Sequence, residues 1–124
     1  MRNLLYALIG VFGCAMFAQQ SQPSTYLVIY KPGPAFLTGK PISAQPLGDH
    51  GRYLLSLHSK GTLKIAGPFT DDSGGALMFS AASDAEAKEI ITKDPAVISG
   101  VFVYELHPWG LVDWESWSKK APAK

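Results

Sequence analysis

Residues 62–80 read TLKIAGPFTDDSGGALMFS, and this stretch decides the fold. Residues 62–66 alternate apolar and polar side chains, and residues 76–80 are mostly apolar, as is typical of strands. Between them, residues 67–75 combine glycine, proline, aspartate and serine, the residue types that tight turns favour. We therefore predict a β-hairpin near the centre of the chain.

A helix pattern precedes this hairpin. Residues 49–60 place Leu54 and Leu57 on one apolar stripe, and Gly61 follows where a left-handed C-terminal residue is expected. His50 lies on the same stripe, in the first turn. The spacing predicts a helix that packs against the hairpin and carries a histidine at its start.

A second helix pattern follows the hairpin. Ser83 and Glu86 form the capping box that begins a helix, and Ile91 lies on its buried stripe. The pattern predicts a last turn that reaches Asp94, because Pro95 then ends the regular helix.

Strand patterns flank the two helices. Residues 26–30 and 101–106 are rich in β-branched and aromatic side chains, and the first run is typical of a strand buried on both faces. Residues 32–48 contain four prolines and three glycines, which predicts a long ordered loop that carries function or covers an edge. The order strand, helix, strand, strand, helix, strand predicts an α+β, ferredoxin-like βαββαβ domain.

The N-terminus has the pattern of a signal peptide. Arg2 precedes an uncharged apolar run over residues 4–18, too short to span a membrane, and a polar linker follows at residues 19–25. We expect cleavage after Ala18 and a periplasmic or secreted mature protein with no membrane span. Lipid attachment at Cys14 is a weaker alternative.

Composition excludes several classes of function. The chain has 124 residues, 47% of them hydrophobic, which suits one domain with its own core. Eleven Lys and Arg against ten Asp and Glu give a formal net charge of +1, and this dispersed charge does not favour nucleic-acid binding. A single cysteine excludes a thiolate metal cluster, and the sequence has no phosphate-binding glycine loop or zinc-ligand spacing. We expect neither a metal nor an organic cofactor.

The predicted topology brings two ionisable side chains to one edge of the domain. Right-handed crossovers in an antiparallel sheet place the start of the first helix, with His50, beside the end of the second, with Asp94. A histidine oriented by a carboxylate is a good general base near neutral pH. In the alternative, structural interpretation, His50 forms only local bonds and Asp94 stabilises the turn at Pro95.

The mature chain resembles the YCII-related (YciI-like) domain family over residues 26–109, with residues 110–124 as an aromatic and polar C-terminal tail. The ordered motifs that carry this resemblance are His50, Leu54, Leu57, Gly61, Leu63, Ala66-Gly67-Pro68, Asp94-Pro95, Gly100 and Pro108-Trp109. The resemblance implies a ferredoxin-like domain that pairs into a dimeric α/β barrel. It also implies an active site built on a His and Asp pair, matched here by His50 and Asp94. Apolar side chains on both faces of the predicted strands likewise favour a homodimer.

Two hypotheses of function follow. In the first, the protein is a small exported enzyme that performs proton-transfer chemistry, lyase-like or hydrolytic, on a small organic molecule. His50 is the general acid and base, Asp94 orients it, and Gly67 and Pro68 form part of the substrate pocket wall. In the second, the protein is a non-catalytic binding or interaction protein of the cell envelope, and the His–Asp contact only ties two helices together.

Overall fold

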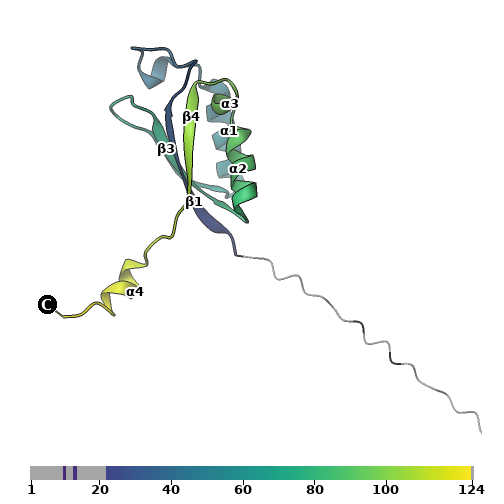
Figure 1. Ribbon diagram of the computed structural model, residues 1–124, viewed down its shortest axis with the longest axis vertical. Helices are drawn as coiled ribbons and strands as arrows, with labels where there is room; N and C mark the ends of the chain where they lie inside the picture. The colour runs from purple at the N-terminus through teal and green to yellow at the C-terminus, as the bar shows by residue number, and fades with distance from the viewer. Residues whose placement is uncertain (1–9, 11–12, 14–21, 124) are drawn as a thin grey trace, which may run out of the picture.

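The computed structural model describes residues 22–123, together with Gly10 and Gly13, and arranges them as one sheet with helices on one side (Figure 1). The predicted signal peptide over residues 1–18 lies outside the described residues, apart from these two glycines. No helix in the described part of the chain is long and apolar enough to cross a membrane. The elements are β1 (Ser24–Pro32), the 3-10 helix η1 (Ile42–Ala44), α1 (Gly48–Ser59), β2 (Leu63–Pro68), β3 (Gly75–Ala81), α2 (Asp84–Thr92), α3 (Pro95–Ile98), β4 (Phe102–Pro108) and α4 (Trp114–Ser118).

The sheet has four antiparallel strands in the order β2-β3-β1-β4. The two central strands, β1 and β3, pair from Ser24 to Tyr30 of β1, and Val28 of β1 faces Leu77 on one side and Leu106 on the other. Helices α1, α2 and α3 all lie on the same face of this sheet (Figure 1). The predicted α+β, ferredoxin-like fold is confirmed.

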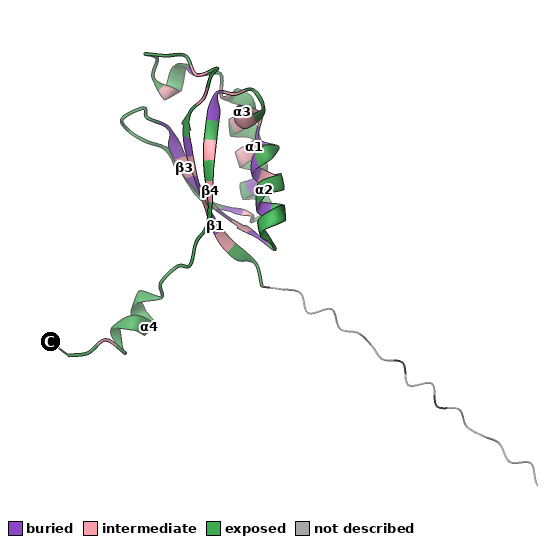
Figure 2. Cartoon of the chain, viewed as in Figure 1, coloured by how far each residue is buried: buried purple, intermediate pink, exposed green. Residues whose placement is uncertain are grey.

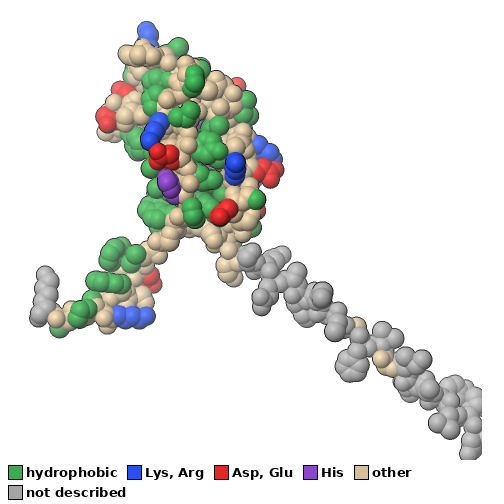
Figure 3. Space-filling model, viewed as in Figure 1, with side chains coloured by type: hydrophobic (Ala, Val, Ile, Leu, Met, Phe, Trp, Pro, Cys, Tyr) green, Lys and Arg blue, Asp and Glu red, His purple; other side chains and the backbone are tan. Residues whose placement is uncertain are grey.

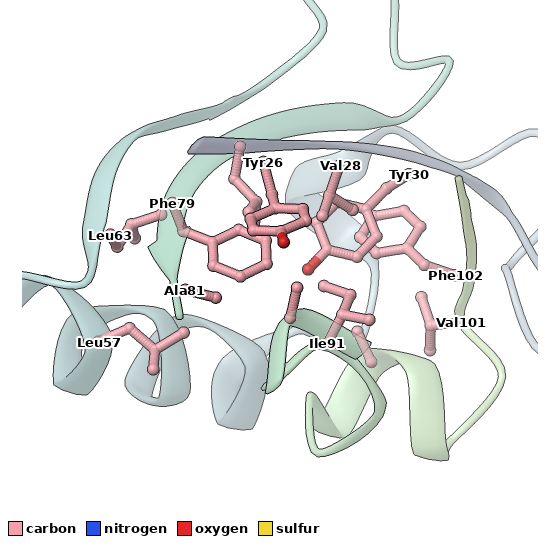
Figure 4. Packing of buried hydrophobic residues seen from close by; sticks show 13 residues of the cluster. Tyr26, Val28, Tyr30, Leu57, Leu63, Phe79, Ala81, Ile91, Val101 and Phe102 are labelled. Carbon is pink, nitrogen blue, oxygen red and sulfur yellow. The ribbon is translucent and has the colours of Figure 1, made fainter. Parts of the chain in front are cut away.

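The core lies between the helices and the inward face of the sheet. Tyr26, Val28 and Tyr30 alternate along β1 and are almost completely buried, and they pack with Phe79 and Ile91 (Figure 4). The intervening residues of β1 point to the other face and are only half-buried (Figure 2). The prediction that this strand is buried on both faces is therefore wrong for the single chain, because α1, α2 and α3 all pack on one side.

The chain between the second helix and the last strand differs from the prediction. Helix α2 ends at Thr92, and Asp94 is the N-cap of the separate helix α3, which begins at Pro95. The prediction that the second helix reaches Asp94 is wrong. Proline is well suited to the first helical position because the N–H that it lacks would have no partner there, and aspartate is a favoured N-cap.

The loop between β1 and α1 is held by one buried side chain. The Gln45 carboxamide accepts a hydrogen bond from the Leu37 backbone N–H at 2.7 Å and donates to the carbonyls of Leu37 and Lys40 at 3.0 and 3.2 Å. At the start of the loop, Gly33 passes so close to the backbone that an added Cβ would lie 2.3 Å from the Gly100 carbonyl oxygen. These contacts hold the loop together and fix its start against the chain that joins α3 to β4.

Candidate active site

Asp94 is a completely buried carboxylate where α3 meets the first turn of α1. Its Oδ1 accepts a hydrogen bond from the Ala96 backbone N–H at 2.9 Å, and its Oδ2 accepts one from the Tyr30 hydroxyl at 2.5 Å. The Nδ1 atom of His50 lies 2.8 Å from Oδ1 and 2.9 Å from Oδ2. Burial of a carboxylate without partners costs several kcal/mol, so these contacts are what allow Asp94 to lie in the core.

Three separate elements contribute to this cluster. His50 is in the first turn of α1, Asp94 caps α3, and Tyr30 is near the C-terminal end of β1. The sequence predicted the start of the first helix beside the end of the second. The structure places it beside the N-cap of α3, which follows α2, and brings His50 and Asp94 into direct contact.

The contact with Asp94 defines the hydrogen-bonding state of His50. An ionised carboxylate only accepts hydrogen bonds, so Nδ1 is the donor and Nε2 is the nitrogen left for a ligand. The His50 ring lies edge-on to Tyr30 and Phe102, with ring centroids 5.4 and 5.8 Å away. The His50 side chain keeps 13% of its surface exposed, so it is accessible although its orientation is constrained.

A cavity of about 230 Å³ lies beside His50. Its walls are mainly apolar or glycine, and the long loop contributes Ile42 and Leu47 to them. Gly67 and Pro68 also line the cavity, but they end strand β2 and do not form the turn that the sequence predicted. Apart from Tyr30, whose hydroxyl is bonded to Asp94, His50 is the one ionisable side chain among the lining residues. The cavity is therefore suited to a small and largely apolar molecule that meets a single base.

The other two histidines lie away from this cluster. His58 is exposed on α1, and His107 lies on the sheet face without helices, 3.6 Å from Glu105. Within the described residues, no group of three His, Cys, Asp or Glu side chains is placed to hold a metal ion. His50 and Asp94 therefore form the buried histidine–carboxylate pair of the described domain, and His107 and Glu105 an exposed one.

The sequence interpretation missed Tyr30. The signal was present, because Tyr30 shares the inward face of β1 with Tyr26 and Val28, and a buried hydroxyl needs a partner. The strand pattern does not identify that partner. The Tyr30 hydroxyl donates to Oδ2 of Asp94, while the Ala96 backbone N–H of α3 donates to Oδ1.

Replacing Tyr30 by phenylalanine is expected to change how stability depends on alkaline pH. Burial, and secondarily the nearby Asp94, raise the pKa of Tyr30 well above its ordinary value of 10.0. The unfolded chain therefore loses this proton first, and the free energy of unfolding falls as pH rises above 10, by about 1.4 kcal/mol per pH unit from this residue. Urea unfolding of the parent and of Tyr30→Phe between pH 9 and 11 measures the difference. Equal slopes for the two proteins would contradict the assignment.

A solved structure shares this fold. The structure of 5-chloro-2-hydroxyhydroquinone dehydrochlorinase (TftG) from Burkholderia phenoliruptrix AC1100, in complex with 2,5-dihydroxybenzoquinone, matches with a TM-score of 0.53 and 22% sequence identity. The match covers 73% of this chain and 97% of that chain. At this identity the likeness concerns the fold.

Sequence comparisons agree with the structural match. The chain is 40% identical to the uncharacterized protein YjpA of Bacillus subtilis (strain 168) over 65 residues, which are 52% of this chain and 76% of YjpA. The model of the YCII-related domain matches residues 24–110, from the start of β1 to just beyond β4. Because this match spans well over half of the sequence, the chain belongs to the YCII-related domain family.

Proposed function

We propose that this protein is a small exported enzyme that performs proton-transfer chemistry, lyase-like or hydrolytic, on a small organic molecule. The observation that carries the proposal is a histidine held through Nδ1 by a buried carboxylate at the wall of an apolar cavity. That a dehydrochlorinase has the same fold supports catalysis on small molecules. Gly67 and Pro68 would form part of the substrate pocket.

In the proposed mechanism, Nε2 of His50 takes a proton from the bound molecule. The imidazolium that forms lies against the Asp94 carboxylate, which stabilises its charge and keeps the ring in position. Phe102 and the edge of Tyr30 limit rotation of the ring, so that the proton can return to the leaving group or to a neighbouring atom. Asp94 acts through His50 and is a positioning residue. Neither step requires a metal or an organic cofactor.

The chemistry of the cavity restricts the substrate. The lining residues include no lysine or arginine, so an anionic substrate would lose its hydration without gaining a cation. An uncharged molecule with one acidic hydrogen suits this cavity better than a carboxylate or a phosphate ester does. This restriction gives the proposal a chemical test.

We also propose that the protein acts as a homodimer after export. The sheet face without helices carries a broad apolar area, with Ile65 and Val103 exposed by 64% and 47% and with Leu27 and Ile29 half-buried. A polar cluster of Lys31, Glu105 and His107 lies beside this area, on β1 and β4. Large exposed apolar faces are usually covered by another protein layer. In a dimer whose two sheets pack face to face, the sheet of each subunit covers the apolar face of the other. Residues 1–18 remain the proposed signal peptide, and we place the mature protein in the periplasm or outside the cell.

A non-catalytic role in binding or interaction at the cell envelope is the second candidate function. The observation that favours it is that Asp94 also caps α3 and accepts the Tyr30 hydroxyl, so the cluster contributes to the fold whether or not a reaction occurs. If the protein is not catalytic, no small molecule should change the nitrogen resonances of the His50 ring.

Nitrogen NMR of the histidine rings distinguishes the two candidates. We expect hydroquinone, an uncharged ring with acidic hydroxyl groups, to shift the Nε2 resonance of His50 while Nδ1 stays protonated. The resonances of His58 and His107 serve as internal controls and should not move, and benzoate should have a much weaker effect than hydroquinone. If neither hydroquinone nor any other uncharged phenol or enol shifts the His50 resonances at millimolar concentration, the enzyme proposal fails.

A further inference from the structure

We propose that the two subunits exchange their C-terminal tails, so that the tail of one copy packs on the sheet face without helices of the other copy. This inference rests on the homodimer of the proposed function but not on the catalytic role of His50.

The aromatic and polar C-terminal tail carries apolar side chains that lie exposed in the part of the chain that the structure describes. Leu111, Val112, Trp114 and Trp117 are exposed by 50% to 67%. The two tryptophan rings lie edge to face with centroids 5.6 Å apart, so they form one continuous apolar surface on α4. Figures 1 and 3 show that α4 and its hydrophobic side chains project away from the domain.

The complementary surface is a groove on the sheet face without helices. The groove has a volume of about 380 Å³ and is lined by Leu27, Ile65, Met78 and Trp109 together with neighbouring residues of β2 and β3. Trp109 is also the last residue before the tail, and its backbone N–H donates to the Thr25 carbonyl at 2.8 Å. The tail therefore leaves the domain at the rim of the groove and points away from it.

The reach of the tail matches the distance to a second sheet. Four residues, 110–113, separate Trp109 from the start of α4, and such a segment extends to about 13 Å at most. Two sheets packed face to face lie about 10 Å apart. The tail can thus cross from the rim of its own groove to the facing subunit and deliver Trp114 and Trp117 there.

The size of the sheet face gives a second reason for the exchange. Four strands about 4.8 Å apart and about 20 Å long present a footprint of about 400 Å². A stable protein interface buries about 800 Å² on each partner. Contacts in addition to the packing of one sheet against the other are needed, and tryptophans are among the side chains that stabilise interfaces most strongly.

Tryptophan fluorescence reports directly on this contact, because all three tryptophans of the chain are at positions 109, 114 and 117. In a Trp109→Phe background, only the two tail tryptophans emit. We expect the emission maximum of the full-length protein to move to shorter wavelength as concentration rises, in parallel with the dimer fraction from sedimentation equilibrium. The double variant Trp114→Ser/Trp117→Ser, made in the protein that keeps Trp109, should raise the dimer Kd at least tenfold. Leu55→Ser, which removes a side chain 63% exposed on α1, should leave the Kd unchanged.

Four other outcomes would contradict the tail exchange, and each identifies a different arrangement of the tail or the subunits. A dimer with no change in tail emission would leave the homodimer standing and reject the exchange. A short-wavelength maximum that is independent of concentration would place the tail on its own subunit. A shift that appears only with phosphatidylglycerol vesicles would identify a lipid surface as the partner of the tail. A monomer at all concentrations would reject the homodimer and the exchange together, without bearing on catalysis.

Discussion

Replacing His50 by alanine is expected to lower kcat by about 10²-fold to 10⁴-fold on any substrate that the protein turns over, while the fold is retained. The reason is that Nε2 of His50 is the one base available at the cavity, because the Tyr30 hydroxyl is already bonded to Asp94. In the variant, Asp94 keeps its bonds from Tyr30 and from the Ala96 backbone, so the carboxylate is not left without partners. The measurement is steady-state kinetics together with far-UV circular dichroism.

His58→Ala is the matched control for this experiment. His58 is on the same helix, but it is exposed and lies outside the cavity, so its removal should leave kcat and KM at parent values. His50→Ala with unaltered turnover would refute the catalytic assignment. The envelope-protein alternative makes the opposite prediction, in which His50→Ala weakens the fold by about 1–3 kcal/mol and no ligand-dependent signal is lost.

Replacing Asp94 by alanine is expected to lower the free energy of unfolding by about 3 kcal/mol or more, because each buried donor that loses its acceptor costs about 1–3 kcal/mol. The change leaves the Tyr30 hydroxyl and the Ala96 N–H buried without an acceptor and removes the N-cap of α3. It also releases Nδ1 of His50, so any activity should fall with stability. Urea unfolding followed by circular dichroism, at one protein concentration for all variants, gives the value.

Two further variants test the reason for this loss. Asp49→Ala removes an aspartate that is paired with Arg52 at the surface. The free energy of unfolding should fall only slightly, because the side chains of Asp49 and Arg52 are 76% and 74% exposed. Tyr30→Phe and Asp94→Ala share the same hydrogen bond, so the double variant should lose less stability than the two single losses added together. A loss of less than 1 kcal/mol in Asp94→Ala would show that the buried contacts of this carboxylate do not support the fold.

Most of the fold could be predicted from residues that are close together in the sequence and from the order of the elements. Alternation at residues 62–66, apolar and β-branched runs at the other three strands and period-3.6 stripes at the two main helices predicted these elements, with boundaries that differ by one or two residues from those observed. The topology rules for a ferredoxin-like domain were enough to bring His50 and Asp94 to the same edge. These features depend on residues close together in sequence or on chain connectivity, and both can be read without coordinates.

The sequence by itself therefore determined the ferredoxin-like order of elements, the family and the two ionisable residues at one edge of the sheet. The tertiary structure alone decided that Asp94 caps α3 and that Tyr30 is its third partner. Tyr30 and Asp94 are 64 residues apart, and no local period relates them. A side chain finds such a partner only when packed elements fix both positions in space, because the energy of a buried hydrogen bond depends on distances between atoms and not on separation along the sequence.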